Sequence, residues 1–364
     1  MAEQIQEEEE EEVILLTSDE IVEAFRLPLT VQKRKPVEAI PSKYKGRTVI
    51  RVGSYNMLSF TKQKANNPGV REVICMTILE HGISILAAQE LAEEGALEMI
   101  RDELNNPTTP NLKRWTGHRG KWECVTSEVA GRMYRASERN GFLWDTSRKI
   151  ELKDHGLLER KQRRRGEKKD FARKPFIGYF KAYRFDFVML SVHLKATGLE
   201  NEDIERLQGE IDTIPNIFEA ICESMPGEDD IMVAGDFNLT PTDESFDDFR
   251  DAKFVNAIQD GTHTNISPTN LEGSMTYDNI WIKQSGRADR QEYTGRSGVC
   301  REGQTHQWIP SNSSKSVPGV PSDHCMIWAE FFYGRDYDEY DEDDLSLGKS
   351  KRYKMGDSGD EDDS

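Results

Sequence analysis

Short apolar runs in the middle of the chain each lead to an isolated polar residue. The runs at 49–52, 83–88, 187–192 and 231–234 are followed in turn by Asn56, Glu90, His193 and Asp236. Short, bounded runs of this kind are typical of buried strands. Because α/β proteins build their sites at strand ends, the repetition predicts a functional site at one edge of a sheet.

Apolar residues recur at helical spacing between two of these strands. Over residues 204–221 they lie three or four apart, which predicts a crossover helix that Pro215 kinks or divides. A second helix is predicted over residues 71–81. Strands that alternate with helices indicate an α/β fold with layered sheets.

Negative charge is concentrated at the two ends of the chain. The 364 residues carry a net charge of −18, of which residues 1–45 contribute −5 and residues 335–364 contribute −7. Acidic, self-repelling stretches are typical of disordered segments. We therefore expect an acidic arm at 1–47, a catalytic domain at 48–334 and an acidic tail at 335–364. The tails would bind basic proteins, compete with nucleic acid for a basic loop, or only aid solubility.

The five cysteines are scattered, and no two form a CxxC pair. They fit a reducing compartment and argue against a cysteine-based zinc site. The start of the chain lacks a secretory pattern, and no apolar run approaches the roughly 18 residues of a membrane span. We expect an intracellular protein, nuclear or cytoplasmic or both, without a membrane partner.

Asp236 and Asn238 follow a buried strand two residues apart, so an extended backbone would point both side chains the same way. Beside a metal-bound phosphate, the carboxylate would orient a water nucleophile while the amide donates to a phosphoryl oxygen. An Asx turn that closes the strand would give the same sequence pattern.

Asp323 and His324 place an acid and an imidazole immediately before an apolar strand, and Asp278 stands at the start of another. Imidazole moves protons near neutral pH, and a carboxylate bonded to it fixes its tautomer. Capped strand entrances would look the same. A lone histidine such as His193 is more often a satisfied structural residue than a catalyst.

Glu90 and Asn56 offer hard oxygen ligands at strand ends. Mg²⁺ and Mn²⁺ take few protein ligands of this kind and keep some of their water. Each of these signals is weak alone. Six strand ends with such groups in one chain are nevertheless hard to attribute to independent accidents.

The order of these groups resembles the endonuclease/exonuclease/phosphatase superfamily, which includes pancreatic deoxyribonuclease and the apurinic/apyrimidinic endonucleases. The resemblance spans residues 48–333 and is carried by Ser54-Tyr55-Asn56, Gln89-Glu90, Ser191-Val192-His193-Leu194, Gly235-Asp236-Phe237-Asn238, Tyr277-Asp278-Asn279-Ile280 and Ser322-Asp323-His324. It implies a four-layer α/β/β/α sandwich of two mixed β-sheets flanked by helices. The long stretch between Asp278 and Asp323 looks most similar to the endonuclease/exonuclease/phosphatase family domain-containing proteins, a subfamily linked to DNA repair.

The resemblance also implies how a metal ion and a proton donor or acceptor are provided. It makes Glu90 the principal ligand of Mg²⁺ or Mn²⁺, with Asn56 and Asp323 supporting the ion or its waters. It makes His324 the general base or acid, oriented by Asp278.

The remaining matched residues act on the phosphate by the same resemblance. Asp236 would position the nucleophile, and Asn238 and His193 would stabilise the phosphoryl group. Glu138 would pair with His193, although a hairpin turn with an exposed glutamate is the alternative. Ala92 departs from the pattern, because the pancreatic enzyme has a DNA-contacting arginine there, and its minor-groove contact is therefore in doubt.

A basic segment at 160–174 favours nucleic acid as the partner. It holds nine basic residues against two acidic ones, and positive charge attracts phosphate backbones. The expected substrate contacts in it are Arg163, Arg164, Arg165, Lys168 and Lys169. A nuclear-localisation patch or a solvated insertion is the alternative.

These features together predict a Mg²⁺-dependent phosphodiesterase that cleaves nucleic acid, in the first place DNA, by attack of an activated water. The superfamily also includes inositol-phosphate phosphatases, sphingomyelinases and deadenylases, so a lipid or RNA substrate is one alternative. A catalytically silent module that binds nucleic acid or protein on the same fold is another. Loss of catalytic positions would mark such a module, and every position that can be matched is retained.

Overall fold

The computed structural model describes residues 43–133, 136–159, 173–194, 230–284, 292–311, 317–334 and 353–354. All of them fall within one compact unit, Arg34–Ser364. The helix predicted over 204–221 lies outside the described residues, as do nearly all of the two acidic ends. So do the expected substrate contacts Arg163, Arg164, Arg165, Lys168 and Lys169.

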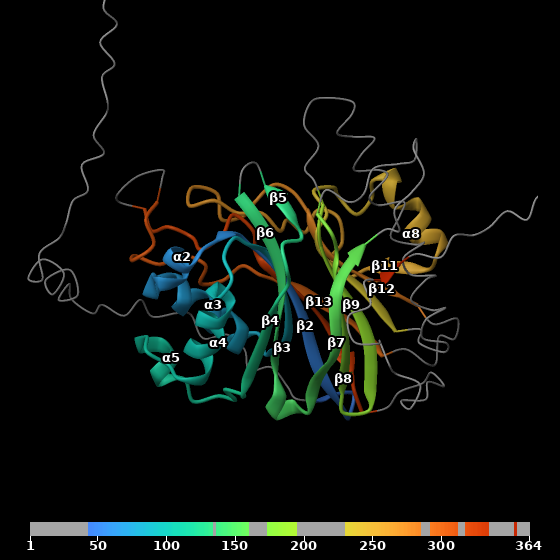
Figure 1. The fold of residues 1–364 in the computed structure, drawn as a ribbon, viewed down its shortest axis with the longest axis horizontal. Coiled ribbons are helices and arrows are strands. Elements are labelled where there is room, and N and C mark those ends of the chain that lie inside the picture. The colour runs from blue at the N-terminus through green and yellow to red at the C-terminus, as the bar shows by residue number, and fades with distance from the viewer. Residues whose placement is uncertain are drawn as a thin grey trace, which may run out of the picture. The chain divides into compact units, whose positions relative to one another are not determined.

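Two β-sheets form the centre of the described structure (Figure 1). The first contains β1 (Lys43–Tyr44), β2 (Arg47–Phe60), β3 (Ile83–Leu91), β4 (Trp122–Thr126), β5 (Gly131–Met133), β6 (Ala136–Asp145), β13 (Tyr293–Cys300) and β14 (Met326–Phe332). Its order is β13-β14-β2-β3-β6-β4, with β1 paired to β2 and β5 to β6. Because β2 and β3 are parallel while β14 and β6 run antiparallel to them, the sheet is mixed.

The second sheet is also mixed. It contains β7 (Ile150–Glu159), β8 (Phe176–Ala182), β9 (Phe185–His193), β10 (Ile231–Asp236), β11 (Phe254–Asn256), β12 (Asp278–Lys283) and β15 (Tyr353–Lys354). The strands follow the order β11-β12-β10-β9-β8-β7-β15. The central pair β9 and β10 is parallel, whereas β12 and β8 flank it in antiparallel fashion.

Alternate side chains of the two sheets fill the space between them. Ile85 of β3 belongs to the core that the sheets share, whereas its neighbour Leu86 packs among the helices. Across the shared core, the rings of Phe142 and Phe176 stack with their centroids 4.9 Å apart. The period of two along each strand therefore sends one face to the opposite sheet and the other to an outer layer.

Short helices cover the outer faces of the sheets (Figure 1). The elements outside the strands are α2 (Lys62–Asn66), α3 (Pro68–Glu80), α4 (Ala96–Asn105), α5 (Pro110–Arg114), α8 (Asp247–Asp251) and the 3₁₀ turns η1 (Thr146–Arg148) and η2 (Glu244–Phe246). Helices α2 to α5 pack on the first sheet, and η2 and α8 pack on the second. This arrangement confirms the predicted α/β/β/α sandwich. No helix in the described ranges has the length and apolar character needed to cross a bilayer.

The helix predicted over residues 71–81 is confirmed as α3, which begins earlier, at Pro68. The side chain of Asn67 accepts hydrogen bonds from the backbone N–H groups of Gly69 and Val70, at 2.8 and 3.3 Å. Proline suits the first helical turn because its missing N–H would have no partner there. Apolar spacing alone misses this start, since the first turn is defined by its cap.

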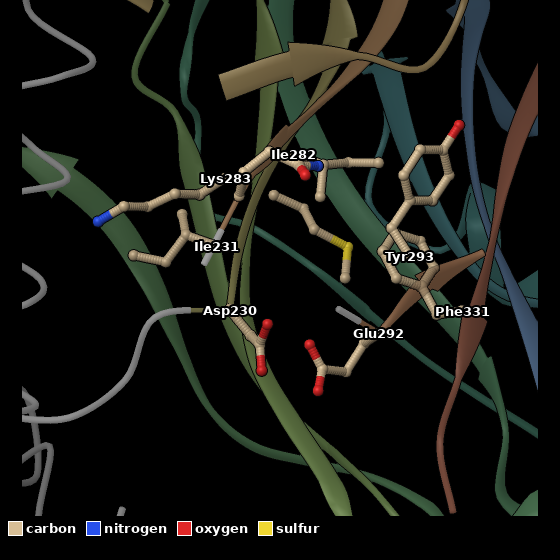
Figure 2. A pocket seen from close by; sticks show the side chains of 9 residues that line it. Asp230, Ile231, Ile282, Lys283, Glu292, Tyr293 and Phe331 are labelled. Atoms are coloured by element: carbon tan, nitrogen blue, oxygen red, sulfur yellow. The ribbon is translucent and has the colours of Figure 1, made fainter. Parts of the chain in front are cut away.

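A small hollow is lined by residues of both sheets, among them Ile282 of β12 and Tyr293 of β13 (Figure 2). Ile231 and Lys283 line it, at the first residue of β10 and the last residue of β12. Asp236 and Asp278 stand at the opposite ends of the same two strands. The hollow is therefore separate from the edge that carries the predicted catalytic residues.

Gly235 lies where β9 and β10 approach each other closely. A Cβ atom at this position would lie 1.8 Å from the backbone carbonyl oxygen of Val192. Gly235→Ala is expected to lower the free energy of unfolding by about 3 kcal/mol, because two central strands would have to shift apart. Urea unfolding followed by circular dichroism measures the loss.

Gly156→Ala in β7 is the matched control, since no atom lies within 4 Å of the added Cβ. It should change the free energy of unfolding by less than about 1 kcal/mol. Equal stability of the Gly235→Ala and Gly156→Ala proteins would contradict the observed spacing of β9 and β10.

Candidate active site

Six polar residues that the sequence places at strand ends lie together at one edge of the sandwich. They are Asn56 on β2, Glu90 on β3, His193 on β9, Asp236 on β10, Asp278 on β12 and His324 two residues before β14. Strand register explains part of the gathering, because Asp236 lies opposite both His193 and Asp278. The edge therefore combines residues from both sheets.

Glu90 is aimed by an irregularity in its strand. Its φ is +58°, and the pairing of β3 with β6 shifts register between Ala88 and Leu91. The side-chain amide of Asn56 donates to Glu90 Oε1 at 2.9 Å, and the backbone N–H of Ser59 donates to Oε2 at 2.8 Å. Bulges change the direction of a side chain relative to a regular strand. The bulge and the two donors thus fix the carboxylate.

Asn56 connects the carboxylates of the two sheets. Its Nδ2 atom donates to Asp236 Oδ2 at 3.0 Å as well as to Glu90, and its Oδ1 accepts from the N–H of Leu58 at 3.0 Å. Only this amide orientation satisfies both carboxylates, because an amide oxygen cannot donate to them. Asn56 therefore presents its nitrogen, not its oxygen, to the two acids.

His324 is held by two aspartates. Its Nδ1 lies 2.8 Å from Asp278 Oδ2, and its Nε2 lies 3.6 Å from Asp236 Oδ2. Burial alone would lower the pKa of His324, but the charges of Asp278 and Asp236 and the hydrogen bond to Asp278 raise the pKa well above its ordinary value. Burial raises the pKa of Asp278 as well. Nδ1 of His324 is therefore engaged by Asp278, and its Nε2 faces Asp236.

His193 occupies a similar position on the other side of Asp236. Its Nε2 lies 3.7 Å from Glu90 Oε1 and 3.6 Å from Asp236 Oδ2, while Nδ1 contacts the carboxylate of Glu138. Burial would lower the pKa of His193, but the hydrogen bond to Glu138 and its charge raise it. The structure thus places Glu138 against His193, as the resemblance implies.

Arg173 belongs to this group, although the sequence around it does not indicate a role at the site. Its side chain is 9% exposed, its Nε lies 2.7 Å from Glu138 Oε2, and its guanidinium donates to the Leu194 carbonyl at 3.0 Å. The amide of Asn238 donates to the same carbonyl at 2.9 Å. The sequence grouped Arg173 with the phosphate-attracting segment, whereas the structure buries it as the partner of Glu138. A long-range pair of this kind leaves no local pattern.

The donor set fits a hard divalent cation. Asp236, Asp278 and His324 each offer one ligand atom, and these atoms lie within 4.8 Å of one another. Asp278 Oδ1 is buried without a hydrogen-bond partner among the described residues. Buried carboxylate oxygens need compensation, and Mg²⁺ and Mn²⁺ prefer oxygen ligands. Asp236, Asp278 and His324 thus form a group that could hold a metal ion.

Asp323 is the exposed member of the predicted set. Its side chain is 55% accessible, and its Oδ1 lies 3.9 Å from His324 Nε2. It is open to a metal ion or to metal-bound water on the solvent side of the edge. Seven of the nine predicted catalytic and metal residues thus lie at this edge, while Glu138 contacts His193 and Asn238 donates to the carbonyl of the next residue, Leu194.

A comparison with curated proteins gives one group of relatives. The chain is 40% identical over 311 residues to endonuclease/exonuclease/phosphatase family domain-containing protein 1 from Xenopus laevis, and the match covers 84% of this chain and 54% of that protein. The chain thus spans about half the length of the curated relatives it matches. No family model matches the chain.

Solved structures share the fold at much lower identity. An endonuclease/exonuclease/phosphatase family protein from Bacteroides thetaiotaomicron aligns with a TM-score of 0.54 and 16% identity, over 78% of this chain and 97% of that one. A mannosyl-6-phosphatase from the same organism aligns with a TM-score of 0.52 and 18% identity, over 77% and 98%. Likeness at this identity extends to the fold alone.

The pairing of His324 with Asp278 predicts that replacing Asp278 changes the pKa of His324. Asp278→Asn should lower the pKa of His324 in the metal-free protein, because the charge that outweighs burial is removed. A raised histidine pKa contributes stability that is complete below the unfolded pKa, about 6.5, and is lost as pH rises through the folded value. The stability lost in Asp278→Asn should accordingly be larger at pH 6 than at alkaline pH.

NMR titration of the ring protons measures this pKa, with His324→Gln used to assign the signal among the seven histidines. His118, which pairs with Asp145 elsewhere on the first sheet, is the internal control and should not change. An unaltered His324 titration in Asp278→Asn would show that Asp278 does not set its charge.

Proposed function

We propose that the chain is a divalent-metal-dependent phosphodiesterase that cleaves nucleic acid, on the basis of its similarity to endonuclease/exonuclease/phosphatase family domain-containing protein 1 and the fold that it shares with an endonuclease/exonuclease/phosphatase family protein. The observation that carries the proposal is the buried edge at which Glu90, Asp236 and His324 meet. Hydrolysis of a phosphodiester needs charge neutralisation, an oriented water and a proton for the leaving oxygen. The edge holds a group suited to each need.

The proposed metal ion is Mg²⁺ or Mn²⁺. Glu90 would be its principal ligand, and Asp236 and Asp323 would contact the ion or its waters. Asn56 uses its amide oxygen on Leu58, so we assign it to holding Glu90 and Asp236 in place. When bound, the ion supplies Lewis acidity and neutralises charge on the phosphoryl oxygens.

His324 and Asp236 divide the proton and water chemistry between them. Asp236 orients the attacking water and accepts the proton that it loses, and the imidazolium of His324 donates its Nε2 proton to the leaving oxygen. The raised pKa of His324 favours this donor role, and Asp278 keeps Nδ1 engaged so that Nε2 faces the site.

His193 and Asn238 act on the phosphoryl group. Glu138 and Arg173 fix Nδ1 of His193, which leaves Nε2 to donate to a phosphoryl oxygen. The Asn238 amide must exchange its bond with the Leu194 carbonyl to reach the substrate. Arg173, which donates to the same carbonyl, would satisfy that oxygen when Asn238 turns.

The preference for nucleic acid rests on the basic segment at 160–174, which carries nine basic and two acidic residues. The resemblance to a subfamily linked to DNA repair makes damaged and branched duplexes the first DNA substrates to test. A mannosyl-6-phosphatase shares the fold, so a phosphatase acting on inositol lipids is the second candidate. Fold alone does not separate these substrates.

Removing the proposed proton donor should abolish catalysis without unfolding the protein. His324→Ala is expected to reduce Mg²⁺-dependent nicking of supercoiled plasmid by about 10²-fold or more. A gel assay at fixed Mg²⁺ concentration measures the loss, and thermal unfolding checks the fold.

His118→Ala is the control, because His118 lies beside Asp145, at the other end of β6 from Glu138. It should cleave at the wild-type rate. Undiminished nicking by His324→Ala would contradict the proposed mechanism.

The basic segment predicts a salt effect. Changing Arg163, Arg164 and Arg165 to glutamine should weaken DNA binding and reduce the slope of log K against log salt by up to about 3, because fewer counterions are released. Fluorescence anisotropy over a salt series measures the slope. A triple change of the exposed Lys113, Arg114 and Lys121 to glutamine is the control and should leave it unaltered. An unchanged slope in the first triple variant would remove the segment from the binding surface.

A panel of labelled substrates separates the candidate functions. Mg²⁺-dependent release of phosphate from phosphoinositides without plasmid nicking would replace the nuclease with a lipid phosphatase. DNA binding without hydrolysis of any phosphoester would favour a silent binding module. Cleavage of RNA alone would keep the mechanism and change the substrate.

A further inference from the structure

Strand β2 contains a bulge directly after Asn56. Asn56 pairs with Gln89 of β3, but the next paired residue, Phe60, lies opposite Leu91. Strand β2 therefore has more residues than β3 between these two pairs. Two of them, Leu58 and Ser59, adopt φ values of +50° and +45°. Residues other than glycine rarely adopt this left-handed backbone, and it persists only where its surroundings hold it.

The bulge supplies two donors to the active edge. The N–H of Leu58 donates to Asn56 Oδ1 at 3.0 Å, which orients the amide toward the carboxylates. The N–H of Ser59 donates to Glu90 Oε2 at 2.8 Å. Regular pairing of β2 with β3 would direct these groups into the sheet ladder instead. The position of Glu90 therefore depends on the shape of the bulge.

The ammonium group of Lys64 binds the carbonyl side of the same bulge. Its Nζ donates to the Met57 carbonyl at 3.0 Å and to the Leu58 carbonyl at 2.5 Å. Lys64 reaches them from the short helix α2, whose first turn is capped by Thr61. Burial lowers the pKa of Lys64 to about 8, against the charges of Asp323 and Glu90.

We infer that Lys64 is a positioning residue of the active site: its ammonium fixes the bulge of Met57, Leu58 and Ser59, and the bulge in turn fixes Asn56 and Glu90. Charge-assisted hydrogen bonds to two successive carbonyls can hold a backbone that its own residues disfavour. The effect on catalysis rests on the proposed function, whereas the effect on the bulge does not. No substrate contact by Lys64 is part of the assignment.

Hydrogen exchange in the metal-free protein tests the bulge directly. In Lys64→Met, the amide hydrogens of Leu58 and Ser59 should exchange about tenfold faster than in wild type, because the carbonyl side of the bulge is released. Lys64→Arg retains the charge and donors for both carbonyls, and should keep exchange near the wild-type rate. Lys62→Met removes an exposed charge from the same helix and is the matched control.

Steady-state kinetics test the consequence for the site. Lys64→Met should lower kcat for Mg²⁺-dependent cleavage by about tenfold, with KM within about twofold, since positioning rather than substrate binding is lost. Lys64→Arg should recover most of the loss. The salt slope of DNA binding should not change, because Lys64 is not assigned to a phosphate.

Each outcome bears on a different part of the inference. Unchanged exchange at Leu58 and Ser59 in Lys64→Met would overturn it, and so would faster exchange with an unaltered kcat. A salt slope reduced by about 1 would make Lys64 a phosphate ligand instead. Wild-type protein that cleaves no phosphoester would remove the proposed function, while the exchange result would still decide the role of Lys64 in the bulge. Should Lys64→Met unfold, Lys64→Gln allows the same measurements.

Discussion

The side-chain amide of Asn56 joins the two sheets at the active edge. It is fully buried and donates to Glu90 on its own sheet and to Asp236 on the other. Two carboxylates this close repel each other strongly where water is excluded, so a shared donor between them is a condition for burying both. The backbone of the same residue accepts from the Ser322 hydroxyl at 2.7 Å, and that hydroxyl accepts from the N–H of His324. The positions of Glu90, Asp236 and His324 thus depend on one residue.

Much of the fold and of the site could be predicted from sequence because both follow simple periodicity. Buried strands are predicted from apolar runs, and a polar residue within four positions after each run marks the edge. The resemblance to the superfamily comes from the order of several residues and not from any single motif. These residues are Asn56, Glu90, His193, Asp236 and Asp278. Helix α3 was predicted from its spacing, while its start at Pro68 depends on the Asn67 cap.

The parts that escaped prediction depend on irregular backbone or on distant pairs. Leu58, Ser59 and Glu90 have positive φ, yet none is a residue type that signals a left-handed turn. The contact of Arg173 with Glu138 joins residues far apart in the sequence, and the basic composition of residues 160–174 did not indicate it. Irregularities of this kind gather where a site needs a side chain aimed away from the pleat. Periodicity in the sequence predicts regular strands and helices, but it does not predict where the backbone departs from them.

Strand β14 has a consequence for the order in which the fold is completed. It lies between β13 and β2, so a strand from late in the chain completes a sheet begun by one of the earliest. His324 arrives with it, two residues before Met326. A ribosome-bound chain that has released β2, β3, β9 and β10 still has an unpaired edge on β2 and lacks His324. The edge that gathers Asn56, Glu90, Asp236 and His324 is therefore assembled only after β14 has been made.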